Sequence, residues 1–320
     1  MAGVIRTVGV VGTGVIGASW TGLFLARGLR VIVSDPSPGA KEELEKNVKS
    51  LWPRLEKLGL SRDASLKNYE FVGGSMQKDH YRELDFVQEN TPEEQSLKEK
   101  IVGEIDANTK ESAIIASSSS GIPSSQFIGK CEKRPERVLI AHPFAPPHLM
   151  PLVEVVPHPQ TDDEVIKRAM DFFKSLGKHP MHIKHEIPGF IANRLQAAVS
   201  AEAYSLVHRG ILSAEDLDAA VTTSIGPRYA LTGPFMSNVI GGGSHRDGFK
   251  DFATKLGPAV QDWLKDMREH AFESNEENII KLNESVHKQL DKQPPGETEA
   301  ERDEVLIELQ DAKKTKKYLV

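Results

Sequence analysis

The chain has 320 residues, of which 39% are hydrophobic and 27% are charged, and its formal net charge is −6. This length predicts about two domains with full hydrophobic cores. The composition excludes a disordered tail protein, a collagen-like chain and a membrane bundle. Lys and Arg are dispersed, which argues against nucleic-acid binding. We see no signal peptide, and the single cysteine, Cys131, cannot form an internal disulfide. We therefore expect a cytoplasmic protein.

The first 35 residues have the pattern of one βαβ unit. Residues 5–11 are a short apolar, β-rich run, and a glycine-rich turn follows at 12–17. Apolar residues then recur at helical spacing from Ala18 to Arg27. Residues 30–34 predict a second strand that ends at Asp35. A strand, a helix and a second strand within this length indicate a parallel pair with a crossover helix.

Helical and strand patterns alternate beyond this unit. Residues 38–58 predict a helix with a charged face, which Pro53 is expected to bend or interrupt. Further strands are predicted at 71–73, 85–89, 113–118, 138–142, 152–156 and 181–184, with helices at 93–106 and 162–176. Such alternation predicts a mostly parallel sheet covered by helices.

The pattern changes at Pro188, after which almost no strand signal remains. The expected helices cover residues 189–209, a segment that starts at Ser213, and 248–270, 274–290 and 299–315. Ser213 begins the helix signature S-A-E-D, which has the form of a capping box. We therefore predict an α/β domain over residues 1–188 and an all-helical domain over 189–320.

The turn at 12–17 is a G-x-G-x-x-G in the context that a Rossmann-type dinucleotide site requires. The first glycine permits the tight turn, the second lets the backbone approach a pyrophosphate, and the third lets helix and strand pack closely. Asp35 is expected to accept hydrogen bonds from the ribose hydroxyls and to repel a 2′-phosphate, which favours NAD over NADP. The alternative is a glycine-rich turn without a ligand. The residues expected to bind the cofactor here are Gly12, Gly14, Val15, Ile16, Gly17 and Asp35.

A histidine and a glutamate are the candidates for proton transfer. His142 ends an apolar strand, and Glu154 lies 12 residues further on, in the next predicted strand. A histidine beside a bound nicotinamide can take the hydroxyl proton as hydride leaves carbon. A buried carboxylate on its other ring nitrogen would fix the tautomer and stabilise the imidazolium. From spacing alone, a structural histidine is equally consistent.

Two further polar residues could complete a site between the domains. Ser120 belongs to a serine run after a predicted strand, and Asn193 lies early in a predicted helix. Loop serines are more often caps or turn residues, and a helical asparagine is more often structural. His179, His182 and His185 do not share a face of a strand, so we expect no metal site.

Together these motifs resemble the 3-hydroxyacyl-CoA dehydrogenase superfamily over about residues 5–245. The resemblance implies an NAD-binding Rossmann domain followed by a helical domain that dimerises and closes the active site. It implies that His142 is the catalytic base, that Glu154 is its partner, and that Ser120 and Asn193 bind the substrate oxygen. The residues that it places on the ribose and nicotinamide side of NAD are Glu93 and Lys98. The expected protein is an NAD-dependent dehydrogenase, a homodimer that acts on a small hydroxy acid or acyl-CoA.

Within the superfamily the sequence favours the lambda-crystallin / L-gulonate 3-dehydrogenase branch, on its length and on the segment IGPRYALTGPF at 225–235. Arg228 in this segment could bind a free substrate carboxylate as a bidentate ion pair; the alternative is a surface arginine. L-carnitine dehydrogenases and short 3-hydroxyacyl-CoA enzymes remain competitors. Ala145 stands where the family commonly has asparagine, near the nicotinamide. That departure keeps open a non-catalytic, crystallin-like NAD-binding protein, and a biosynthetic reductase is a third alternative.

Overall fold

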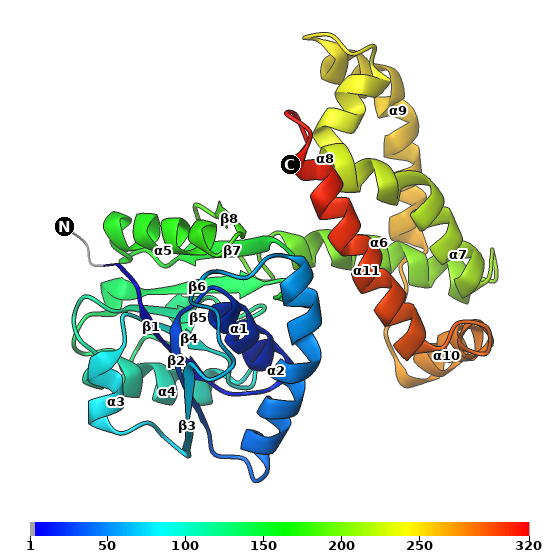
Figure 1. Cartoon of the computed structure of the whole chain (residues 1–320). Helices are drawn as coiled ribbons and strands as arrows, with labels where there is room; N and C mark the ends of the chain where they lie inside the picture. The colour runs from blue at the N-terminus through cyan, green and yellow to red at the C-terminus, as the bar shows by residue number, and fades with distance from the viewer. Residues whose placement is uncertain (1–3, 320) are drawn as a thin grey trace. The chain divides into compact units, whose positions relative to one another are not determined.

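The computed structural model describes residues 4–319, and the chain divides after Arg194 into two compact units (Figure 1). The predicted boundary near residue 188 lies in the segment that leads into α6 (Ala192–His208). The division itself falls close to the start of that helix.

The first unit is built on one eight-stranded sheet with the order β3-β2-β1-β4-β5-β6-β7-β8. All neighbouring strands run parallel except β6 and β7, which are antiparallel. The strands are β1 (Thr7–Val11), β2 (Arg30–Asp35), β3 (Tyr69–Gly73), β4 (Phe86–Glu89), β5 (Ile114–Ser117), β6 (Val138–Pro143), β7 (Leu152–Pro157) and β8 (His179–His182). The central strands bury nearly every residue, as parallel strands covered on both faces do.

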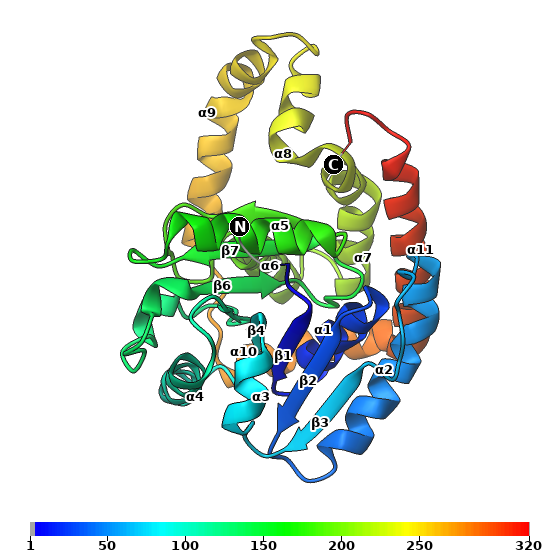
Figure 2. The ribbon, with the colours of Figure 1, turned by 60° about the vertical axis from the view of Figure 1, so that its left-hand side comes forward.

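Helices cover both faces of this sheet. The core on one face is formed with α1 (Val15–Ala26), α2 (Ala40–Lys57) and α5 (Asp163–Ser175). On the other face the core includes residues of α3 (Lys78–Glu83) and α4 (Gln95–Asn108). Figure 2 shows α2 on one side of β1, β2 and β3, with α3 and α4 on the other. The predicted mostly parallel α/β domain followed by a helical domain is thereby confirmed.

Aromatic side chains are the largest buried ones in the core between the sheet and helices α1, α2 and α5. Trp20 stacks on Phe24 with ring centroids 5.4 Å apart, and Phe86 lies 5.6 Å edge-on to Phe173. Full burial of a side chain of this size contributes roughly 1.5–3 kcal/mol. This cluster packs α1 and α5 against the sheet, and α1 is the helix that follows the glycine-rich turn.

The structure differs from the sequence prediction at Pro53, and it contains short helical segments that were not predicted. Pro53 does not interrupt α2, whose buried residues Leu44, Val48 and Leu55 lie on both sides of it in the chain and hold the helix to the core. The single-turn helix α3 was not predicted, because six residues are too few for a periodic signal. Short 3₁₀ turns at Ser124–Gln126 and Pro135–Arg137 were also unforeseen.

The second unit consists of helices joined by loops, with no strand among its described residues. It contains most of α6, and then α7 (Ala214–Ala220), a π-helical segment (Val221–Ile225), α8 (Gly226–Gly241), α9 (Gly248–Glu269), α10 (Glu276–Leu290) and α11 (Pro295–Lys314). Ser213 caps α7 through its hydroxyl, which accepts a hydrogen bond from the Asp216 amide. The sequence did not reveal α8, because Gly233 and Pro234 interrupt its periodicity; the backbone is non-helical at Gly233.

The helices of the second unit expose many apolar side chains. Among the described residues, α7, α8 and α10 contain no buried side chain. Large exposed apolar residues of this unit include Phe235, Met236, Ile240, Trp263, Ile279 and Ile280. Within residues 4–319, no helix has both the length and the apolar character to cross a membrane.

Candidate active site

The candidate residues of the first unit gather at one edge of its sheet. Strands β1, β2, β4, β5 and β6 run parallel, so their carboxyl ends meet there. Dinucleotides and substrates bind at this edge in open α/β sheets. The residues placed at these ends include Asp35, Glu89, Ser117 and His142.

The glycine-rich turn between β1 and α1 has two glycines that the fold requires. Gly12 has φ +90°, and a Cβ there would lie 2.8 Å from the Asn90 carbonyl oxygen. A Cβ on Gly17 would lie 1.9 Å from the Gly12 carbonyl oxygen. A Cβ on Gly14 would instead enter open space at the N-terminus of α1. The turn therefore keeps an open cradle where helix amides can bind a pyrophosphate, and the fold by itself does not need a glycine there.

Asp35 lies at the end of β2, beside this turn. Its Oδ2 accepts hydrogen bonds from the Thr13 amide at 2.7 Å and the Thr13 hydroxyl at 2.9 Å, and its Oδ1 accepts one from the Ser37 amide at 2.8 Å. Burial raises the pKa of Asp35, but these hydrogen bonds outweigh burial and hold the pKa below its ordinary value. The side chain is therefore an ionised acceptor, as recognition of ribose hydroxyls requires.

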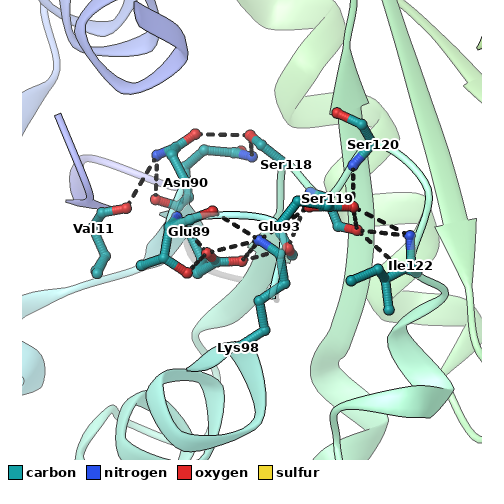
Figure 3. A network of polar contacts seen from close by, with 12 residues as sticks. Val11, Glu89, Asn90, Glu93, Lys98, Ser118, Ser119, Ser120 and Ile122 are labelled. Atoms are coloured by element: carbon teal, nitrogen blue, oxygen red, sulfur yellow. Dashed lines mark hydrogen bonds and ion pairs between the residues drawn. The ribbon is translucent and has the colours of Figure 1, made fainter. Parts of the chain in front are cut away.

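Lys98 is enclosed in a polar network between β4, β5 and α4 (Figure 3). Its side chain is 1% exposed, and Nζ lies 3.1 and 3.2 Å from the two carboxylate oxygens of Glu89. Nζ also donates to the Thr91 carbonyl oxygen at 3.1 Å, and the Ser117 hydroxyl donates to Glu89. The resemblance placed Lys98 on the cofactor, and in this structure its ammonium is occupied by the protein. Sequence reasoning missed Glu89, because only the fold shows that it is buried beside a lysine.

Glu93 holds the serine-rich turn that follows β5 (Figure 3). Its Oε1 accepts hydrogen bonds from the Ser119 hydroxyl at 2.6 Å, the Ser120 amide at 2.9 Å, the Gly121 amide at 3.0 Å and the Ile122 amide at 3.3 Å. Burial raises the pKa of Glu93, but these donors and the nearby charge of Lys98 outweigh it, so the pKa is lowered. The carboxylate thereby fixes the turn that carries Ser120.

His142 and Glu154 are directly opposite each other in the antiparallel pair of β6 and β7. Nδ1 of His142 lies 2.7 Å from Oε2 of Glu154, and the two side chains are 5% and 0% exposed. The other oxygen, Oε1, accepts hydrogen bonds from the Ile191 amide at 2.9 Å and the Ala192 amide at 3.0 Å. Burial raises the pKa of Glu154, but the bonds from His142 and from these amides outweigh it and lower the pKa. A charged carboxylate is thus held on one ring nitrogen of the histidine.

Asn193 also reaches this edge, because its Nδ2 donates to the Ser120 carbonyl oxygen at 2.6 Å. Phe190, which sequence reasoning did not single out, lies with its ring centroid 5.6 Å from that of His142. Ala145 is exposed in the loop after β6. Arg228 is exposed on α8 of the second unit.

The fold and this edge define a class of protein, an NAD-dependent dehydrogenase with a Rossmann-type cofactor domain. The chain belongs to the 3-hydroxyacyl-CoA dehydrogenase family, whose NAD binding domain profile matches residues 7–187 and whose C-terminal domain profile matches residues 189–278. The cofactor is NAD, and the open cradle at Gly14 fits its pyrophosphate. Within residues 4–319, no group of three or more His, Cys, Asp or Glu side chains is placed to hold a metal ion.

Similar proteins align with this chain over most of its length. A "3-hydroxyacyl-CoA dehydrogenase" of Gibberella moniliformis is 48% identical over 309 residues, which are 97% of this chain and 95% of that protein. An "L-carnitine dehydrogenase" of Staphylococcus epidermidis is 40% identical over 257 residues, 80% of this chain and 78% of that protein. Among solved structures, (S)-3-hydroxybutyryl-CoA dehydrogenase of Ralstonia eutropha is 29% identical with a TM-score of 0.61, over 79% of this chain and 87% of that chain. The similarity supports the superfamily and leaves the branch a prediction.

Proposed function

We propose that this protein oxidises the 3-hydroxyl of a short 3-hydroxy acid, and that His142 is the general base. The observation that carries the proposal is the buried contact between His142 Nδ1 and Glu154 Oε2, at 2.7 Å. With Nδ1 engaged, Nε2 is the nitrogen that would take the hydroxyl proton. The negative Glu154 then stabilises the imidazolium that forms, and two backbone amides keep the carboxylate in place. Bound NAD supplies the acceptor for the hydride.

Ser120 and Asn193 are proposed to bind the reacting oxygen. The Asn193 amide uses one hydrogen for the Ser120 carbonyl, and an amide nitrogen carries two. The second hydrogen of Asn193 and the hydroxyl of Ser120 are the donors proposed for the oxygen that becomes a carbonyl. Donors already fixed before reaction stabilise developing charge with little reorganisation.

A free carboxylate is the proposed difference between this substrate and an acyl-CoA. Arg228 is exposed and carries a planar donor fork that can bind a carboxylate with two hydrogen bonds. An L-gulonate-like acid is favoured, and the similarity to L-carnitine dehydrogenases makes L-carnitine the next candidate. NADH production should be measured with L-gulonate, L-3-hydroxybutyrate, L-carnitine and L-3-hydroxybutyryl-CoA. Arg228→Ala should raise KM for a free acid at least tenfold and leave KM for the thioester nearly unchanged.

The role of His142 is tested by His142→Ala. The variant should lose about two to four orders of magnitude in kcat, the usual range for a general base, with an unchanged Kd for NAD. Unchanged turnover would overturn the proposal. NAD binding by wild type without turnover on any acid of the panel would support the second candidate, a crystallin-like binding protein, which the exposed Ala145 keeps open.

We also propose that residues 189–320 form a dimerisation domain. Large apolar side chains are exposed on α8, α9 and α10, and exposed apolar surface is typical of protein interfaces. A second copy of this chain is the proposed partner, and the proposed compartment is the cytoplasm. Sedimentation equilibrium should give a mass of twice 35.3 kDa at micromolar concentration. A concentration-independent monomer would contradict this assembly.

A further inference from the structure

Phe190 has a backbone conformation that is unusual for a residue with a side chain. Its φ is +48°, in the left-handed region, and it follows Gly189, whose φ is +72°. A bulky residue in this region is strained, and such strain persists only where the surroundings enforce it. The Phe190 amide donates to the Ile187 carbonyl oxygen at 3.1 Å, which closes a tight turn just before α6.

The turn at Phe190 points two consecutive amides at one oxygen. The next residues, Ile191 and Ala192, donate to Oε1 of Glu154 at 2.9 and 3.0 Å. The direction of these amides depends on the backbone at Phe190, because a φ change there rotates everything that follows. The strained residue therefore sets the orientation of the carboxylate that His142 contacts.

The Phe190 ring lies beside His142, the partner of Glu154. The side chain is 0% exposed and lies with its centroid 5.6 Å from the His142 ring, tilted by 52°. It also packs in the core on the α4 face of the sheet. A buried aromatic ring at this place excludes water from the hydrogen bond between His142 and Glu154, which strengthens that bond.

We propose that Phe190 is a positioning residue for the reaction. Its left-handed backbone aims the amides that hold Glu154, and its ring keeps His142 on that carboxylate. The inference rests on the proposed function of His142 and Glu154. It adds that their alignment depends on a residue that carries no titratable group.

The first test compares three variants in the full-length protein. Phe190→Ala should lower kcat by about 10- to 100-fold, the loss expected from a misplacement of about 1 Å, with an unchanged Kd for NAD. Phe190→Leu keeps apolar volume and should recover most of this loss. Phe173→Ala, which empties a comparable fully buried site on the opposite face of the sheet, should lower Tm but leave kcat within twofold. An equal kcat for Phe190→Ala and Phe173→Ala would overturn the proposal.

The second test needs no substrate. In protein labelled with ¹⁵N-histidine, the Nδ1–H signal of His142, identified by its loss in His142→Ala, should resist exchange with water. It should vanish or exchange rapidly in Phe190→Ala and persist in Phe190→Leu. Persistence in Phe190→Ala overturns the role of Phe190. Absence of a protected signal in wild type overturns the His142–Glu154 arrangement itself.

A double-variant cycle separates the two proposals further. Phe190→Ala should cost much less in kcat when Glu154 is already alanine, because no carboxylate remains to be oriented. An equal loss in both backgrounds would show that Phe190 does not act through Glu154.

Discussion

The ammonium of Lys98 lies within 3.2 Å of both carboxylate oxygens of Glu89, and both side chains are almost completely buried. Burying two charges is costly unless each compensates the other, and removing one leaves the other uncompensated in the interior. Glu89 belongs to β4 and Lys98 to α4, so this ion pair connects the strand to the helix.

Lys98→Met should therefore lower the free energy of unfolding by about 3–5 kcal/mol, the usual cost of breaking a buried ion pair. Urea denaturation measures this loss. Lys100→Met, at an exposed position of the same helix, is the matched control and should change stability by about 0.5 kcal/mol or less. A stable Lys98→Met variant with a tenfold higher Kd for NAD would instead show that Lys98 acts mainly on the cofactor.

Gly14 and Gly17 of the glycine-rich motif should respond differently to replacement by alanine. Gly14→Ala should fold with unchanged stability, because its Cβ meets open space, yet bind NAD at least tenfold more weakly because the methyl group occupies the pyrophosphate cradle. Gly17→Ala should be strongly destabilised, because its Cβ would lie 1.9 Å from a backbone oxygen. Calorimetric titration with NAD and thermal melts measure both effects. Normal NAD affinity in Gly14→Ala would contradict the assigned cradle.

Glu154 should contribute to stability in a pH-dependent way. Its pKa in the folded protein is lowered, so its stabilising interactions are fully present above the ordinary glutamate pKa. They are lost as the pH falls from there through the lower, folded value, because the folded state must then take up the proton. The difference in unfolding free energy between wild type and Glu154→Gln should shrink as the pH falls from 7 to 3. A difference that stays constant over this range would show that the carboxylate is not held in its charged form.

Lys178 should also make stability rise with pH, but over a more alkaline range than Glu154. It donates to the carbonyl oxygens of Pro147 and Met150, in the loop between β6 and β7. Burial, with a smaller effect from the charge of Arg27, lowers its pKa from 10.5 to about 7. Between these values the unfolded chain binds more protons than the folded chain, so stability rises with pH.

The unfolding free energy of wild type relative to Lys178→Met should therefore increase from pH 7 to pH 10. Urea denaturation at several pH values measures the difference. Lys174→Met, at an exposed position of α5, should show no such trend. A flat difference for Lys178→Met would mean that the lysine stays charged in the folded protein.

The order of elements and the cofactor site could be predicted from sequence because both depend on local patterns. Short apolar runs that alternate with helical periods indicate a parallel sheet, and G-x-G-x-x-G followed by Asp35 indicates a dinucleotide-binding turn and predicts Asp35 as the ribose acceptor. The same local patterns missed α8, because Gly233 and Pro234 break its helical periodicity and the backbone is non-helical at Gly233.

The partners of buried polar groups were decided by tertiary structure. The sequence proposed His142 and Glu154 but could not show that they meet; the antiparallel register of β6 and β7 places them opposite each other. Glu89 and Phe190 carry no local signal, because a buried ion pair and a strained turn depend on which segments pack together. Local sequence thus determined where the chain can turn and what it can bind, and long-range packing decided which charges are enclosed and how they are aligned.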